Sequence, residues 1–144
     1  MTRYTAFLKA AATLAALAAS SGALAQIDAS LRGTWAPDTK ACAAGPLLRV
    51  AADTITVVEG DKSKTLGDVD VCHSCAGGAR YQGIVKMVTT EFSTGKPTPL
   101  MVVFNADERR GVARVDIIEP SVGVGASLAG KNLRKCKDAP GAAR

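Results

Sequence analysis

The sequence is poor in the residues from which most catalytic sites are built. It contains a single histidine, His73, and only 4% of its 144 residues are aromatic. A serine nucleophile would need this histidine as its base, but neighbouring Ser74 would point to the opposite face of a strand. The carboxylates are scattered along the chain, and no acid–base pair stands out among them. We therefore predict that the protein is not an enzyme and has no catalytic residues.

Aromatic rings are also too few for a broad binding platform. Beyond residue 25 the chain has four of them, Trp35, Tyr81, Phe92 and Phe104. Proteins that bind single-stranded nucleic acid stack bases on several exposed rings. Four rings in a domain of this size are needed in its core, so we predict no nucleic-acid partner.

Long apolar runs are confined to the N-terminus, MTRYTAFLKAAATLAALAASSGALAQ. Arg3 and Lys9 give a basic start, residues 10–19 form a short apolar run, and Ala23-Leu24-Ala25 ends it with small residues. This layout is typical of a secretory signal peptide that is cleaved before Gln26. A membrane span needs about 20 apolar residues, so we expect no stable membrane anchor. The sequence thus predicts a signal peptide over 1–25 and a periplasmic or secreted protein.

Cleavage would leave a chain that suits one domain, residues 26–144. It would remove two of the 18 basic residues and none of the 13 acidic ones, so the net charge would fall from +5 to +3. Residues 131–144 carry five basic residues and one acidic residue. We interpret them as a short, solvated, basic C-terminal tail. The alternative is an electrostatic contact with an anionic lipid or polymer.

Cysteine is scarce but even in number: Cys42, Cys72, Cys75 and Cys136. An even count in an exported chain predicts disulfides, because the compartment beyond the membrane favours oxidised thiols. Two bridges are expected, and the sequence leaves all three pairings open.

The stretch VCHSC places Cys72 and Cys75 three positions apart. Haem attachment would need histidine directly after the second cysteine, and zinc usually needs two close ligand pairs, so we predict no cofactor and no metal. A C-x-x-C pair also occurs in thiol–disulfide oxidoreductases, usually at the start of a helix. Gly77 and Gly78 make a poor first helical turn, which favours a structural role. A thiol–disulfide oxidoreductase or redox sensor that uses Cys72 and Cys75 remains the alternative function.

Apolar residues alternate with polar ones in DTITVVEG, YQGIVKMV and GVARVDII, as in strands with one buried face. LMVVF, residues 100–104, is continuously apolar, and the polar segment 105–111 predicts a hairpin loop after it. No amphipathic segment of twelve or more residues separates the strands, so crossover helices are not expected. We predict an all-β protein, a single antiparallel barrel or sandwich. One or two short helical turns are expected, at 36–44 and 127–135.

The stretch LRGTW places Gly33 two residues before Trp35, just inside the expected mature N-terminus. It resembles the opening strand of lipocalins and avidins, and that of small periplasmic β-barrel inhibitors of bacterial metalloproteases. The resemblance implies an up-and-down antiparallel barrel in which the tryptophan closes one end. Two features depart from the inhibitor family. The inhibitors usually have one disulfide near the start of the chain, whereas this chain has four cysteines. Residues 26–30 are also too short to form a projecting inhibitory segment.

Together these features predict a non-catalytic binding protein held by two disulfides. Its partner would be a small apolar ligand in the barrel mouth or another protein, and inhibitor-like binding is one form that the second alternative could take. Loops on a rigid scaffold usually carry recognition. We expect the loops Val71 to Arg80 and Asn105 to Gly111 to bind, and the candidate binding residues are Trp35, His73, Arg80, Arg109 and Arg110.

Overall fold

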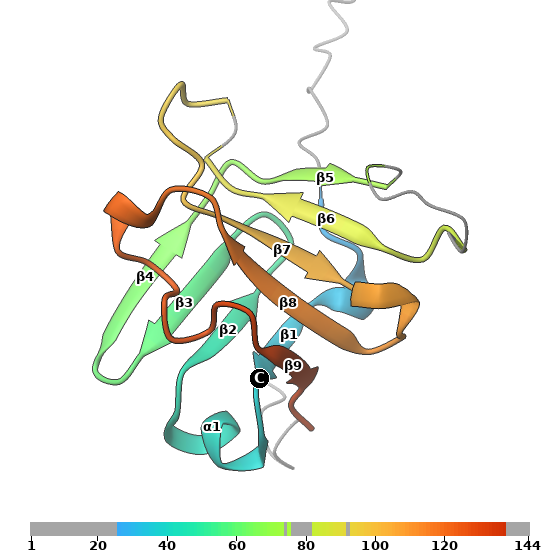
Figure 1. Cartoon of the computed structure of the whole chain (residues 1–144), viewed down its shortest axis with the longest axis vertical. Coiled ribbons are helices and arrows are strands. Elements are labelled where there is room, and N and C mark those ends of the chain that lie inside the picture. The colour runs from blue at the N-terminus through green and yellow to red at the C-terminus, as the bar shows by residue number, and fades with distance from the viewer. Residues whose placement is uncertain (1–25, 74, 76–81, 92, 138–144) are drawn as a thin grey trace, which may run out of the picture.

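The computed structural model of the chain describes residues 26–73, 75, 82–91 and 93–137. The predicted signal peptide and Arg80 lie outside these residues. The described residues form nine strands in one antiparallel, curled sheet, with one six-residue α-helix and three 3-10 turns (Figure 1). The predicted all-β class is confirmed.

The strands follow one another in the sheet almost as they do in the chain. They are β1 (Gly33–Ala36), β2 (Leu47–Val50), β3 (Ile55–Glu59), β4 (Lys62–Leu66), β5 (Asp70–Cys72), β6 (Lys86–Thr89), β7 (Leu100–Phe104), β8 (Val112–Ile117) and β9 (Asn132–Lys135). Their order across the sheet is β4-β3-β2-β1-β9-β8-β7-β6-β5. This is the order of an up-and-down meander that is open between β4 and β5.

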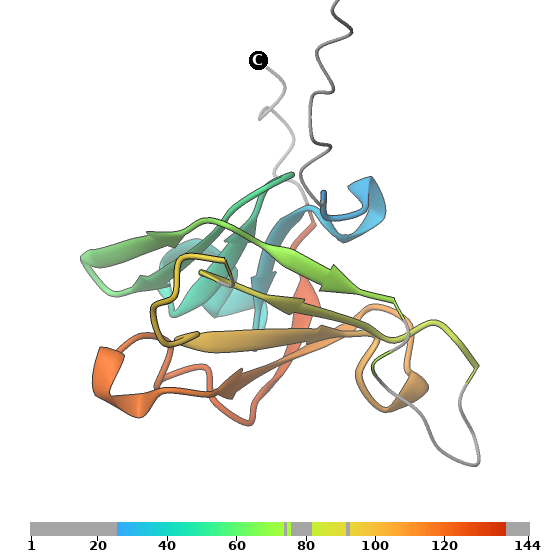
Figure 2. The same cartoon turned by 90° about the horizontal axis from the view of Figure 1, so that it is seen from above.

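The last strand, β9, joins the two halves of the sheet. It pairs with β1 through Trp35 and Lys135, and with β8 through Ala113 and Leu133. The edges are β4 and β5, which the three residues 67–69 connect. Because the sheet curls, β1–β4 and β5–β8 lie on opposite sides of a shared interior (Figure 2).

The alternation of inward and outward side chains along each strand determines which residues form the core. One face of each strand supplies apolar side chains to the interior, including Ile55 and Val57 from β3 and Val102 from β7, all at most 2% exposed. Trp35 and Phe104 pack edge to face with their ring centroids 5.3 Å apart. The Trp35 indole Nε1 donates to the carbonyl of Leu31, 2.9 Å away, which satisfies its buried polar atom.

The long connection between β8 and β9 crosses the sheet and is held by a distant carboxylate. Glu59 accepts hydrogen bonds from the amides of Gly125 and Ser127 and from the Ser127 hydroxyl. The Ser127 hydroxyl is the main cause that lowers the Glu59 pKa, and partial burial opposes it. Leu128, next in the chain, is fully buried in the core.

Several local predictions are confirmed, with shifted boundaries. Segment 105–111 connects β7 and β8 as an antiparallel hairpin. The helix expected over 36–44 forms as α1 (Thr39–Ala44), where the Asp38 side chain accepts from the Ala41 amide and caps the first turn. In the described part of segment 81–88, residues 82–88, strand begins at Lys86, as β6.

The helix predicted over 127–135 is wrong. Residues 132–135 form β9, and only a turn precedes them. The slot between β1 and β8 offers backbone hydrogen bonds on both sides, and Leu133 fills the interior there with no exposed surface. Tertiary pairing therefore overrides local preference. Part of the predicted basic tail is consequently a central strand.

Two smaller apolar clusters lie on the outer face of the sheet. Ala36 and Leu47 are covered by Ala41 of α1. On the other half, Val85, Val103, Ala106 and Val112 form a cluster that Met87 and Met101 extend. In the part of the chain that the structure describes, no helix is long and apolar enough to cross a membrane.

Candidate functional site

One of the two loops predicted to carry recognition, Asn105 to Gly111, is joined to residues 82–84, which follow the other predicted loop, Val71 to Arg80. The Asn105 side-chain Nδ2 donates to the carbonyl of Ile84 at 2.8 Å, and the Gln82 amide donates to the Glu108 carboxylate at 3.0 Å. These bonds tie the β7–β8 hairpin to the segment that leads into β6. We call the described residues 72–73, 82–84 and 105–111 the loop surface.

The hairpin has an unusual backbone. Asn105, Asp107 and Glu108 adopt left-handed φ angles of 53°, 54° and 57°, although L residues other than glycine rarely do so. Asn105 supports this shape because its Oδ1 accepts from the amide of Gly111 at 3.1 Å. Such backbone conformations cost energy and occur most often where the chain has a function.

Arg109 belongs to a network of charges within the hairpin and the neighbouring strand. Its guanidinium lies 3.1 Å from the Asp107 carboxylate and 3.3 Å from the Asn132 Oδ1. Arg114 pairs with Asp107 and with Asp116 at 3.3 and 3.4 Å. The Arg109 and Asp107 side chains are about half exposed, so their pair contributes little to stability.

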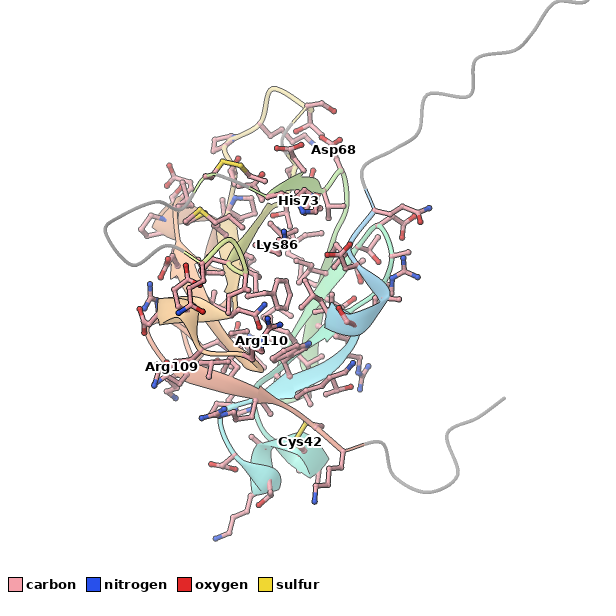
Figure 3. All side chains as sticks on the ribbon, turned by 90° about the vertical axis from the view of Figure 1, so that its right-hand side faces the viewer. Cys42, Asp68, His73, Lys86, Arg109 and Arg110 are labelled. Atoms are coloured by element: carbon pink, nitrogen blue, oxygen red, sulfur yellow. A yellow bond between two sulfur atoms is a disulfide. The ribbon has the colours of Figure 1, made fainter. Side chains whose placement is uncertain are left out.

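Arg110 faces a different way. In Figure 3 Arg109 is labelled at the outer edge of the hairpin, whereas Arg110, Lys86 and His73 are labelled nearer the centre of that view. The last β5–β6 pair is Cys72 with Met87. The same register places His73 opposite Lys86, on the face of the sheet that turns to the interior. His73 and Arg110 are exposed and Lys86 is half-buried.

The remaining candidate residues lie elsewhere. Trp35 is only 2% exposed and belongs to the core, so it is not part of the loop surface. Arg80 lies outside the described residues. Sequence reasoning missed Asn105 and Glu108, whose side chains bond to residues 84 and 82. The one signal was Asn105 itself, since asparagine tolerates a left-handed turn before a glycine-ended loop.

The four cysteines form two disulfides, as predicted. Cys42 of α1 pairs with Cys136 after β9, across 94 positions of sequence, with a Cα–Cα distance of 5.8 Å. Cys72 pairs with Cys75, only three positions away, with a Cα–Cα distance of 5.6 Å. Cys72 ends the edge strand β5 and is half-buried, whereas Cys75 is exposed.

Metal ligands do not gather in the part of the molecule that is described: no group of three or more His, Cys, Asp or Glu side chains there could hold an ion. The carboxylate of Asp68, near the edge of the sheet, instead accepts from the amide and the hydroxyl of Ser93. The Ser93 hydroxyl is the main cause that lowers the Asp68 pKa.

The fold and the cysteines define an all-β protein with a curled up-and-down sheet and two disulfides. Comparison with models of known protein families, with curated proteins and with solved structures gave no match.

Proposed function

We propose that the protein is an exported, non-catalytic binding protein that recognises another protein through the loop surface. The observation that carries this proposal is the pair of hydrogen bonds, Asn105 to Ile84 and Gln82 to Glu108, that fixes the hairpin loop against the segment leading into β6. A surface fixed before binding loses less conformational entropy in a complex. The two disulfides support export, because they persist in oxidising compartments.

The packed interior favours a protein partner over a small apolar ligand in the barrel mouth. Trp35, Leu48 and Phe104 fill the interior and are at most 2% exposed. A ligand placed among them would have to displace close-packed side chains, which is costly. Arg110 belongs to the loop surface and Lys86 follows its segment 82–84 closely, so we expect an acidic segment of the partner to contact these two cations.

The test is capture from the exported protein fraction on immobilised mature protein, followed by affinity measurement with the purified partner. Lys86→Glu with Arg110→Glu should weaken binding at least tenfold and lower the association rate, because both charges are reversed. Arg49→Glu, an exposed charge reversal on the outer face of β2, is the matched control. The proposal fails if no captured protein binds the wild type more tightly than the Lys86→Glu, Arg110→Glu double variant. It also fails if the double variant binds as tightly as the Arg49→Glu control.

A second candidate function is thiol–disulfide exchange at Cys72 and Cys75. The observation that favours it is their pairing with each other, with the exposed Cys75 at the end of an edge strand. A dithiol donor would attack the Cys75 sulfur and release Cys72 as a thiolate. The donor's second thiol would then break the mixed disulfide, leaving the donor oxidised and both cysteines reduced.

Thiol labelling and non-reducing peptide mapping across defined redox buffers distinguish this function from a structural bridge. An exchange site should open in the range of glutathione or protein disulfide isomerase, while Cys42–Cys136 stays closed. If both bridges resist all but strong reductant, Cys72–Cys75 is structural and the exchange function is excluded.

A further inference from the structure

A groove lies between α1 and β9, next to the Cys42–Cys136 disulfide. Its volume is about 390 Å³, which falls within the range of small-molecule sites. One wall comes from the segment at α1 and the other from β9 and the residues after it. The groove is lined by Ala36, Asp38, Thr39, Cys42, Arg134, Lys135, Cys136 and Lys137.

The lining combines apolar groups with exposed cations. Ala36 is 1% exposed, and the half-buried disulfide lies beside it. Arg134 and Lys137 are both exposed. This composition suits a molecule that has an apolar body and one charged end, because the body leaves water while the charge finds a partner.

The cations of the groove differ in their availability. Lys135 Nζ donates to the carbonyl of Ser30, so this amine is already engaged away from α1. The ion pairs found within the described part of the chain involve Arg109 and Arg114, and neither Arg134 nor Lys137 takes part. The one carboxylate in the lining, Asp38, accepts from the Ala41 amide as the helix cap. Among the described residues, the groove therefore presents two cations that form no ion pair with a carboxylate.

We propose that this groove binds a small amphiphilic carboxylate, such as a medium-chain fatty acid. Arg134 would hold the carboxylate, which matches the planar guanidinium fork, and Lys137 would add a second charge. The alkyl chain would lie along Ala36 and the disulfide. This site uses none of the loop-surface residues, so it stands or falls separately from the proposed protein partner.

Calorimetric titration of the oxidised mature protein with decanoate, below its micelle concentration, tests the site. Decanol has the same chain without the charge, and acetate has the charge without the chain. We expect decanoate to bind at least tenfold more tightly than either, because each lacks one of the two interactions. Equal binding of decanoate and decanol, or no binding of decanoate, overturns the proposal.

Substitutions then locate the site. Arg134→Gln should weaken decanoate binding about tenfold, which corresponds to one lost charge-assisted hydrogen bond. Lys137→Gln should have a smaller effect in the same direction.

Arg49→Gln removes an exposed charge from β2, outside the lining, and should leave the affinity unchanged. Both test positions are exposed, so the near-ultraviolet circular dichroism should stay that of the wild type. If all three variants bind like the wild type, decanoate binds elsewhere and the assignment of the groove is wrong.

Discussion

The two disulfides connect regions of the molecule that depend on them to different degrees. Cys42–Cys136 joins α1 to the end of β9 across 94 positions, whereas Cys72–Cys75 closes a ring across three. Closing a loop of about 100 residues removes enough unfolded-state entropy to stabilise a protein by roughly 4.7 kcal/mol, and short loops give much less. The corner of α1 and β9 thus needs its bridge for stability. The Cys72–Cys75 bridge, beside the loop surface, is expected to contribute less to stability, which leaves it open to a functional role.

The largest expected effect tests this difference directly. Cys42→Ser with Cys136→Ser should lower the free energy of unfolding by about 4 kcal/mol, and Cys72→Ser with Cys75→Ser by about 2 kcal/mol or less. Denaturant unfolding of the oxidised proteins measures both values. Equal losses in the two double variants would remove the distinction between the bridges.

Glycine substitutions compare the corner of α1 and β9 with the loop surface again, with smaller expected losses of stability. An added Cβ at Gly45 would lie 2.5 Å from the Cα of Ala41 in α1, so Gly45→Ala should destabilise the protein by about 2–3 kcal/mol through overpacking. Gly111, in the loop surface, has open space around it but a φ of +73°. Gly111→Ala should therefore cost only about 1 kcal/mol, from backbone strain.

Thermal or denaturant unfolding of both alanine variants measures the difference. Gly67→Ala, which has neither a positive φ nor an atom within 4 Å of the added Cβ, is the control and should be close to neutral. A Gly45→Ala variant as stable as this control would mean that α1 can move away from the sheet at little cost.

A third connection, the hydrogen bonds between Glu59 and Ser127, joins distant parts of the chain without a covalent bond, and its contribution to stability can be measured. Ser127→Ala should cost about 1 kcal/mol at neutral pH, because it removes one hydrogen bond to a carboxylate. The Glu59 pKa is lowered in the folded protein, so the contact stabilises fully above the ordinary value of 4.5. Its contribution is lost as the pH falls below that value and through the lowered folded pKa.

Urea unfolding of wild type and Ser127→Ala at a series of pH values checks this prediction. The gap between the two proteins should be widest near neutral pH and should narrow in acid. A gap that stays constant with pH would show that the Ser127 hydroxyl acts by packing and not through the Glu59 charge.

The smallest effect belongs to the ion pairs of the loop surface. Arg109→Ala should lower stability by no more than about 0.5 kcal/mol, and added salt should remove most of that loss. Arg49→Ala supplies the baseline for removing an exposed arginine from a strand. A loss of several kcal/mol on Arg109→Ala would mean that the hairpin depends on its charges as strongly as the corner depends on its disulfide.

The sequence predicted the parts of the fold that local pattern determines. LMVVF and GVARVDII are apolar or alternating over their whole length, and the polar stretch between them ends in glycine, so β7, β8 and their hairpin were predictable. The pairing of the cysteines was not, because the sequence allows three pairings and the choice depends on which strands meet.

Strands that depend on their neighbours escaped prediction. NLRK has one apolar residue, Leu133, and becomes β9 because β1 and β8 leave a slot that only a strand can fill. KSKTL becomes β4 by pairing with β3 and is exposed along four of its five residues, and lysines are typical of such edge strands. For the candidate site, the loops were predictable from their composition. The bonds that fix the hairpin loop were not, because the side chains of Asn105 and Glu108 bond to residues 84 and 82, more than 20 positions away.

The position of β9 also bears on the order in which the molecule assembles. Each of the two meanders, β1–β4 and β5–β8, pairs strands that follow closely in the chain, so each can begin to form as soon as it has been synthesised. Until β9 enters between them, β1 and β8 present unpaired edges that are open to association with other chains. Because β9 brings Cys136 beside α1, we expect the Cys42–Cys136 bond to form fastest after that step, so its rate of formation would report the completion of folding.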